Sequence, residues 1–335
     1  QGERTNTINY DIYGYIAAMI DPLGGVTSYK RDGMGRILVE TKPDGRKIAY
    51  TYDLNGNLKT VTPDGKGTHT FNYNGEQLLS EYVPPSAGSG VWKTQYAYDV
   101  DKNITQITKP DGNIIYFHRD ATSHRIDQVG DGTDGDETYY SYDFDGNVNS
   151  TSYFGVNLNI TYNGKQVASE IHSICCDLPY SALVEYGYDD HYRQNRIKLT
   201  DHSLGVQKVD LYYDKDDNLR RSGDMTIDRD DVGKVTNMKL DKSSVHYFYD
   251  KQYGELSKIE YQFNGKPKLT FEYKRDKLGR INYESNGNGF EQLLYDKSGR
   301  YIGRTKPFST TPLSNYIYDG NGDRIRGYDN RRSFN

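Results

Sequence analysis

Apolar and polar residues alternate along most of the chain in short runs. In residues 50–53, Tyr-Thr-Tyr-Asp, the two rings stand two positions apart, and Ile37, Val39 and Thr41 have the same spacing. A period of two places alternate side chains on one face of a β-strand. We find no stretch with the 3.6-residue period of an amphipathic helix. The pattern therefore predicts an all-β protein built from short strands.

Two kinds of turn signal separate these runs. An Asp closes each tyrosine run and a Gly often follows three residues later, as Asp53 and Gly56 do. Asp side chains bond nearby backbone in turns, and Gly accepts a positive φ. A second signal, Pro-Asp-Gly, stands at 43–45, 63–65 and 110–112, where Pro presets φ for a turn. Each unit is thus predicted to be a β-hairpin, and successive hairpins to form an antiparallel meander.

The hairpin unit repeats about every 20–23 residues along nearly the whole chain. A single hairpin is marginal in water, whereas a stack of hairpins buries a continuous layer of tyrosines. Because a long meander twists in one sense, we expect one repeat domain over 1–335 that spirals into a large hollow barrel or shell. We expect the second Tyr of each unit to lie on one common, largely buried face. The predicted structural residues are Tyr52, Asp53, Gly56, Tyr98, Asp99, Tyr142, Asp143, Gly146, Tyr295, Asp296, Gly299, Tyr318 and Asp319.

The composition fits a folded protein with a thin core. Only 34% of the 335 residues are hydrophobic, but 33 are Tyr, whose rings pack although their hydroxyl tips are polar. The net charge is -5 and the basic residues are scattered, so we expect no nucleic-acid partner. No apolar run is long enough to predict a membrane span. The adjacent Cys175 and Cys176 are expected to be two thiols, because neighbouring cysteines bridge poorly.

The motif Y-x-Y-D-x-x-G-R/N, with x-P-D-G spacers, resembles the YD-repeat or Rhs-repeat family. That family includes bacterial Rhs and wall-associated proteins, the shell components of insecticidal Tc toxins, and animal teneurins. The resemblance implies a β-sheet wound into a hollow shell, which encloses a cytotoxic C-terminal segment in the toxins and supports cell-surface adhesion in teneurins. Bacterial shells usually end in a DPxGL-type self-cleavage motif. Here DPLGG stands at 21–25, followed by another repeat, and is interpreted as an ordinary spacer.

Two segments, 116–125 and 186–196, depart from the repeat by placing His beside Tyr and Arg. We expect His118 to replace the second Tyr of its unit and to point inward with that layer. An inward His with Tyr and Arg nearby could abstract a proton from a sugar acid, as in a polysaccharide lyase. The alternative is a histidine that has merely replaced a tyrosine in a worn repeat. The candidate catalytic residues are His118, Arg119, Asp120, His124, Tyr188, His191, Tyr192 and Arg193.

Two loops carry weaker signals. Residues 130–137 contain Asp131, Asp134 and Asp136, and such oxygen ligands on a glycine-rich loop could hold Ca²⁺. The spacing differs from an EF-hand loop, so a solvated acidic loop is favoured, and no metal or cofactor is expected. Trp92, the single Trp, lies on a predicted loop and is a possible platform for a sugar ring.

Three functions remain open from the sequence. The favoured one is a secreted or cell-surface scaffold, for encapsulation of a toxin segment or for adhesion. Its partners would be a cell-surface glycan or protein, or an enclosed C-terminal segment absent from this chain. The alternatives are a carbohydrate-active enzyme, most plausibly a polysaccharide lyase or hydrolase, and a glycan-binding module. The N-terminal residues 1–11 already look like the middle of a repeat, so we expect a piece of a longer extracellular chain.

Overall fold

The computed structural model describes residues 3–85, 92–132, 136–174, 180–287, 289–306, 309, 311–319 and 322–329. These residues form thirty β-strands and no helix. The chain forms two units, which are described below. Within each unit, paired strands run antiparallel and follow one another in sequence, as β5 and β6 do. The all-β class and the antiparallel hairpin meander predicted from the sequence are confirmed. Within the described ranges there is consequently no helix with the length and apolar character needed to cross a membrane.

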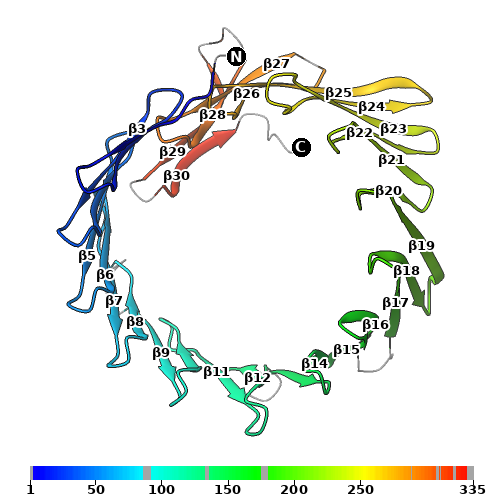
Figure 1. The fold of residues 1–335 in the computed structure, drawn as a ribbon, viewed down its shortest axis with the longest axis horizontal. Helices are drawn as coiled ribbons and strands as arrows, with labels where there is room; N and C mark the ends of the chain where they lie inside the picture. The colour runs from blue at the N-terminus through cyan, green and yellow to red at the C-terminus, as the bar shows by residue number, and fades with distance from the viewer. Residues whose placement is uncertain are drawn as a thin grey trace. The chain divides into compact units, whose positions relative to one another are not determined.

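Contacts divide the chain into two compact units, whose strands are labelled in Figure 1. The first comprises 1–77, 82–91 and 242–335, and the second 78–81 and 92–241. Strand β8 (Leu79–Val83) is divided between them. The first unit contains β1 (Thr7–Tyr10), β2 (Ile16–Ile20), β3 (Val26–Arg31), β4 (Ile37–Thr41), β5 (Lys47–Tyr52), β6 (Leu58–Pro63), β7 (His69–Tyr73), β23 (Ser243–Tyr249), β24 (Leu256–Phe263), β25 (Lys266–Arg275), β26 (Ile281–Ser285), β27 (Phe290–Tyr295), β28 (Tyr301–Thr305), β29 (Pro312–Tyr318) and β30 (Arg324–Asp329).

The second unit continues the same meander in chain order. Its strands are β9 (Thr94–Tyr98), β10 (Ile104–Thr108), β11 (Ile114–Arg119), β12 (Ile126–Gly130), β13 (Thr138–Tyr142), β14 (Val148–Tyr153), β15 (Val156–Asn163), β16 (Gln166–Ile174), β17 (Tyr180–Tyr188), β18 (Gln194–Asp201), β19 (Gly205–Tyr213), β20 (Leu219–Ser222), β21 (Met225–Arg229) and β22 (Val235–Leu240).

The turn between β5 and β6 shows how the Asp and the Gly of each unit build a hairpin. The Asp53 amide donates to the Asn57 carbonyl at 2.9 Å, and the Gly56 amide donates to the Asp53 carbonyl at 3.1 Å. The Asp53 carboxylate accepts the backbone N–H groups of Asn55 and Asn57 at 2.9 and 2.8 Å. Gly56 has a φ of 91°, which a residue with a Cβ adopts only at a cost. We call this arrangement, with Asp or Asn at its start, a YD turn.

The tyrosines of each unit share one face of the sheet. In β5, Tyr50 and Tyr52 are half-buried while Thr51 between them is exposed, and β9 repeats this with Tyr96 and Tyr98. The common face is therefore confirmed. The burial is shallower than expected, because no hydrophobic side chain in the described part of the chain is fully buried. The tyrosines of these strands therefore pack against neighbours in the same sheet and stay partly accessible to solvent.

Candidate functional site

The second Tyr of most units binds the preceding unit through its hydroxyl group. Tyr52 donates to the Ile37 carbonyl at 2.9 Å, and Tyr142 donates to the Ile126 carbonyl at 2.6 Å. Each acceptor is the first residue of the return strand one hairpin earlier. Further bonds of this kind join Tyr73 to Leu58, Tyr98 to Leu79, Tyr162 to Val148, Tyr188 to Val167, Tyr213 to Gln194, Tyr295 to Ile281 and Tyr318 to Tyr301. Among these acceptors Val167 is the one exception, because it is the second residue of its strand and not the first.

Some units have Arg at the position of the second Tyr, and the guanidinium reaches the same acceptor. Arg31 donates to the carbonyl of Ile16, the first residue of β2, at 3.2 Å and to the turn carbonyl of Gly35 at 3.0 Å. Arg229 and Arg275 bond Leu219 and Leu256, the first residues of β20 and β24, in the same way. Arg and Tyr are therefore interchangeable donors here, which sequence reasoning missed.

Many YD turns end in an Arg, which contacts the Asp of its own turn and the second Tyr of the next unit. Arg36 forms an ion pair with Asp32 at 2.7 Å, and its guanidinium carbon lies 4.5 Å from the centre of the Tyr52 ring in the next unit. In the same geometry, the hydrogen bond from Arg193 lowers the pKa of the Asp189 carboxyl below its usual value. We call the Asp–Arg pair, the Arg–ring contact and the Tyr hydroxyl bond together the interlock. It recurs with Arg193 over Tyr213, Arg280 over Tyr295 and Arg300 over Tyr318.

The prediction that His118 points inward with the tyrosine layer is wrong. Its side chain is 65% exposed and its Nδ1 lies 2.6 Å from an Asp127 carboxylate oxygen. Phe117 and Arg119 are half-buried and occupy the two positions of the layer, whereas His118 is on the opposite face. The sequence Tyr-Phe-His-Arg-Asp allowed two registers, and a one-residue shift in a strand reverses the face of every side chain.

The neighbouring candidates of the first segment belong to a YD turn. Asp120 starts the turn, and its carboxylate accepts the Ser123 amide at 2.7 Å. His124 takes the place of the turn glycine with a φ of 58°, and its amide donates to the Asp120 carbonyl. Arg125 then lies 5.3 Å from the centre of the Tyr142 ring. Asp120, His124 and Arg125 therefore occupy the positions of the turn Asp, the turn Gly and the turn Arg of other units.

The second candidate segment is also a YD turn. Tyr188 bonds the Val167 carbonyl at 2.8 Å, and Arg193 pairs with Asp189 at 2.7 Å. His191 donates its backbone N–H to the Asp189 carboxylate, and Tyr192 takes the glycine position with a φ of 62°. The segment therefore has the hairpin geometry of the other units. Tyr188 lies on the tyrosine face, and Asp189, His191, Tyr192 and Arg193 lie on the turn.

Of the loop candidates, the structure describes Asp131, Asp136 and Trp92. The Asp136 carboxylate accepts the Tyr153 hydroxyl at 2.9 Å, whereas Asp134, Cys175 and Cys176 lie outside the described residues. Within the described ranges, no group of three His, Cys, Asp or Glu side chains could hold a metal ion. Trp92 is 48% exposed at the beginning of the segment that leads to β9.

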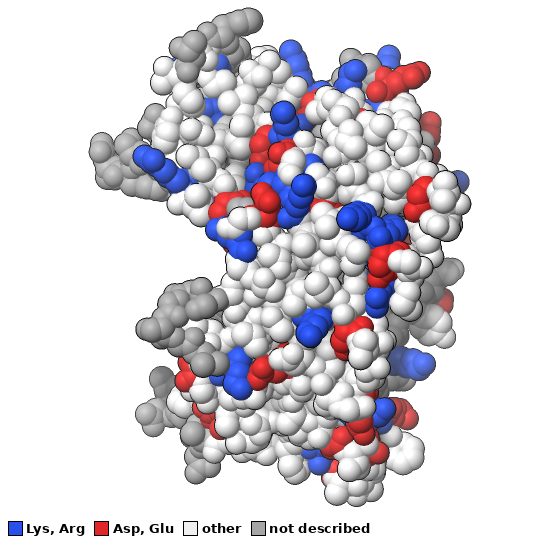
Figure 2. All heavy atoms as spheres, turned by 90° about the vertical axis from the view of Figure 1, so that its left-hand side faces the viewer, with Lys and Arg blue, Asp and Glu red and all other residues white. Residues whose placement is uncertain are grey.

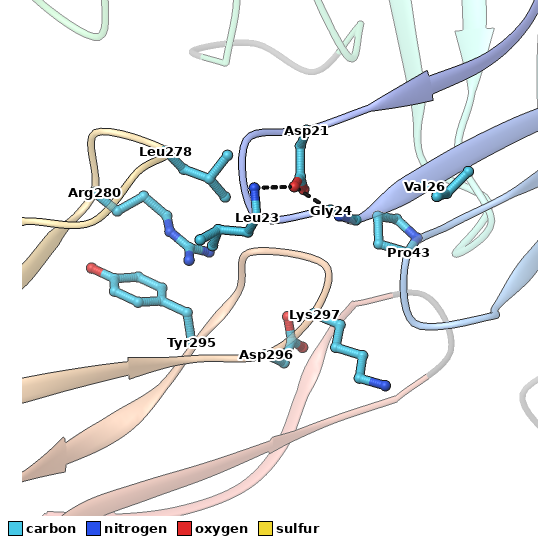
Figure 3. A pocket seen from close by; sticks show the side chains of 11 residues that line it. Asp21, Leu23, Gly24, Val26, Pro43, Leu278, Arg280, Tyr295, Asp296 and Lys297 are labelled. Atoms are coloured by element: carbon cyan, nitrogen blue, oxygen red, sulfur yellow. Dashed lines mark hydrogen bonds between the residues drawn. The ribbon is translucent and has the colours of Figure 1, made fainter. Parts of the chain in front are cut away.

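A groove in the first unit lies where its N-terminal hairpins meet its C-terminal hairpins (Figure 3). It has a volume of about 480 Å³ and is lined by Leu23 and Pro43 from one side and by Leu278 and Tyr295 from the other. The Asp21 carboxylate at its edge accepts the Leu23 and Gly25 amides at 2.8 Å, so DPLGG forms an ordinary capped turn.

Ion pairs hold the two sides of this contact together. Asp44 lies 3.5 Å from Arg300, and Lys66 lies 2.9 Å from Asp319. We call the contact of spacer turns 21–25, 42–46 and 63–66 with YD turns 276–280, 296–300 and 319–323 the seam.

A further ion pair, between Arg4 and Glu255, joins the residues ahead of β1 to the turn between β23 and β24. Arg4 binds both oxygens of the Glu255 carboxylate, at 2.7 and 2.8 Å, and its guanidinium carbon lies 4.0 Å from the centre of the Tyr253 ring. On the face drawn in Figure 2, acidic and basic side chains lie next to one another without a large area of one sign. This one face therefore lacks the continuous basic stripe that is typical of a nucleic-acid interface.

The chain is similar in sequence to teneurins and to a bacterial nuclease. Teneurin-1 of Gallus gallus is 23% identical over 326 residues, covering 88% of this chain and 11% of that protein. Teneurin-3 of Danio rerio is 23% identical over 351 residues, covering 95% of this chain and 12% of that protein. A tRNA3(Ser)-specific nuclease, WapA of Bacillus spizizenii, is 27% identical over 221 residues, covering 54% of this chain and 9% of that protein. The chain thus spans only a small part of these relatives.

Solved structures show the fold. The crystal structure of TcdB2-TccC3 superposes with a TM-score of 0.72 at 14% identity, covering 96% of this chain and 22% of that chain. TcdB2-TccC3-TEV gives 0.71 at 13% identity, covering 96% and 21%. The family model described as Teneurin YD-shell matches residues 1–333. The chain therefore belongs to the teneurin YD-shell family.

Proposed function

We propose that this chain is a structural segment of an extracellular YD-repeat shell, acting as one repeat domain over 1–335 and serving as a scaffold for adhesion at the cell surface. The observation that carries the proposal is the interlock, which is complete three times in the described part of the first unit and once in that of the second. It engages the Asp, Arg and Tyr side chains that would otherwise be candidates for chemistry, as Asp32, Arg36 and Tyr52 are. Side chains engaged in these contacts stabilise the sheet, which favours a structural role.

Adhesion is favoured over encapsulation because the teneurin matches extend along most of the chain. Teneurin-3 of Danio rerio covers 95% of it, whereas WapA covers 54%. An adhesive scaffold needs a rigid, exposed sheet that holds its partner-binding surface in place. Its partner would be a protein or a glycan on another cell surface.

Encapsulation is a second candidate, supported by the TM-score of 0.72 against TcdB2-TccC3. In that case the sheet would surround a segment of polypeptide that lies outside this chain. A protease-sensitive peptide fused to residue 335 would then resist digestion while the sheet is folded. Digestion at the rate of the free peptide would contradict this second candidate.

The enzyme hypothesis receives less support from the geometry. His118 lies on the face opposite Arg119, and the residues from Tyr188 to Arg193 form one repeat turn. A catalytic site needs unlike groups that converge on one reacting atom. We therefore expect no turnover by these residues.

Cell binding by the folded protein tests the adhesion proposal. Beads coated with the chain would be placed on a panel of cultured cells, and the bound beads counted after washing. The matched control is a chain with Tyr52, Tyr142 and Tyr318 replaced by Ala, which should lose protease resistance and bind no cells. We expect the intact chain to bind at least one cell type. Folded chain that binds no better than bare beads across the panel contradicts adhesion.

A further inference from the structure

A second pocket of the first unit lies at the seam, on the tyrosine face of β5, β6 and β7. It has a volume of about 550 Å³, which is within the range of about 300–1,000 Å³ that is usual for small-molecule sites. The spacer turns supply Lys42, Arg46 and Pro63 to its lining, and the YD turns supply Arg300 and Gly322. The pocket is therefore formed by both sides of the seam.

The charged residues of this lining are basic. Lys42, Arg46 and Arg300 line the pocket together with His69, and no Asp or Glu among the described residues does so. The groove beside Leu278 differs, because carboxylates line it together with basic side chains. The pocket therefore presents N–H donors to a ligand, and these donors are suited to an anion.

Two carboxylates outside the lining hold these donors in place. One oxygen of Glu40 pairs with Lys42 at 2.6 Å, and the other accepts the Tyr50 hydroxyl at 3.4 Å. The Asp44 carboxylate accepts the Arg46 Nε–H group at 2.6 Å. Side chains that are fixed before a ligand arrives lose little freedom when it binds, which favours affinity.

The rest of the lining is mostly apolar or aromatic. Tyr50 pairs with Val61 across β5 and β6, and Val61 pairs with His69 on β7, so the three side chains form one row on the same face. Ile48 and Pro63, which also line the pocket, pair two residues along. A sugar ring has C–H groups on its faces and hydroxyl groups on its edge. It would find both apolar contacts and polar partners in this pocket.

The charge balance favours a carboxylate over a phosphate as the anionic group. Lys42, Arg46 and Arg300 each have a carboxylate partner, so the pocket has little excess positive charge. A phosphate group adds a charge of about −1.5 to −2 at pH 7, whereas a carboxylate adds a single negative charge. Guanidinium groups also match the planar geometry of a carboxylate. A singly charged sugar acid therefore fits the pocket best.

We propose that this pocket binds an acidic sugar residue, whose carboxylate lies between Lys42, Arg46 and Arg300 and whose ring lies against Tyr50 and Val61. A uronic acid at the end of a glycan is joined through its anomeric carbon, so its carboxylate is available to the pocket. The proposal rests on the adhesive function proposed above and deepens it, because it makes the partner on the other cell an acidic glycan.

Methyl NMR of the full chain, titrated with methyl β-D-glucuronide, tests the pocket directly. We expect the signals of Ile48 and Val61 to shift with a dissociation constant on the order of 1 mM, because one sugar residue makes few contacts. Methyl β-D-glucoside, which lacks the carboxylate, should bind at least about tenfold more weakly, and Lys42→Gln and Arg46→Gln should each weaken glucuronide binding about fivefold or more. The matched control is Lys109→Gln, which changes the exposed Lys of the other Lys-Pro-Asp-Gly turn and should leave binding unchanged.

Several results would overturn the proposal. One is a set of Ile48 and Val61 signals that stay in place up to about 20 mM glucuronide, where a millimolar contact would be largely occupied. Others are equal binding of the glucoside or of inorganic phosphate, and binding that Lys42→Gln and Arg46→Gln leave unchanged although their other methyl signals show an intact fold. The titration uses no cells, so a failed titration with beads that still bind cells contradicts the pocket alone. Sugar binding by a chain that binds no cells contradicts adhesion alone.

Discussion

The Tyr52 hydroxyl lies 2.9 Å from the backbone carbonyl oxygen of Ile37, fifteen residues earlier in the chain. The bond fastens one hairpin to the start of the preceding return strand. It also explains why a thin sheet without a fully buried hydrophobic residue in its described part uses tyrosine and not phenylalanine at this position. The ring supplies apolar area, and the hydroxyl satisfies a carbonyl.

Tyr52→Phe should lower the free energy of unfolding by about 0.5–1.5 kcal/mol, because it removes the hydrogen bond and keeps the ring. Tyr52→Ala should cost about 2–4 kcal/mol, since the half-buried ring is lost as well. Urea unfolding followed by circular dichroism measures both. Tyr13→Phe is the control, because the exposed Tyr13 ring lies on a turn tip. A Tyr52→Phe protein as stable as the parent would contradict this role of the hydroxyl.

Arg31→Tyr should be tolerated, whereas Arg31→Ala should destabilise the first unit by about 1–3 kcal/mol. The Arg31 guanidinium donates to the Ile16 and Gly35 carbonyls, and a tyrosine hydroxyl at the equivalent position of other units reaches the first type of acceptor. Thermal unfolding of the two variants provides the comparison. Equal destabilisation by both substitutions would show that Arg and Tyr are not equivalent donors.

The ion pair between Arg4 and Glu255 should make the first unit less stable in acid. The hydrogen bond from Arg4 lowers the pKa of the Glu255 carboxyl below its usual 4.5 in the folded state. A group whose folded pKa is depressed adds stability above the unfolded pKa, and this stability is lost as the pH falls through the folded pKa. Urea unfolding between pH 7 and pH 3 measures the slope. Arg4→Ala should flatten this part of the profile, and an unchanged slope would exclude the pair as its source.

Neither His118 nor His191 should support lyase chemistry. We expect a flat ultraviolet trace when the protein is incubated with a panel of uronic-acid polysaccharides, because these side chains lie on an open face and on a turn. A steady rise from unsaturated product that disappears in His118→Ala or His191→Ala would overturn this expectation. Circular dichroism of the two variants serves as the control that the sheet is intact.

Local features of the fold could be predicted from the sequence because each is set within a few residues. The aromatic-x-Tyr-Asp pattern fixes a strand face and its turn, and Gly56 fixes the turn conformation. The register failed at His118, where Tyr116 and Phe117 are both aromatic and the Arg119 position was not known to be equivalent to Tyr. Knowledge that both side chains donate to the same carbonyl would have placed His118 on the open face.

The seam could not be predicted because it depends on residues far apart in the chain. Asp44 and Arg300 are 256 positions apart, and nothing in either local sequence singles out the other. Opposite charges occur on many of the turns, so many alternative pairings are equally plausible from sequence. The choice among them is made by the accumulated geometry of the intervening hairpins.

The seam also has a consequence for the order in which the protein is made. Strands β1 to β7 leave the ribosome before the turns that complete their contacts, at 276–280, 296–300 and 319–323, which are translated more than 200 residues later. At about 5–20 residues per second, the wait is on the order of 10–40 s. During that time Leu23 and Pro43 face solvent without Leu278. The nascent chain therefore carries an open apolar notch that a chaperone, or another nascent copy, has time to reach.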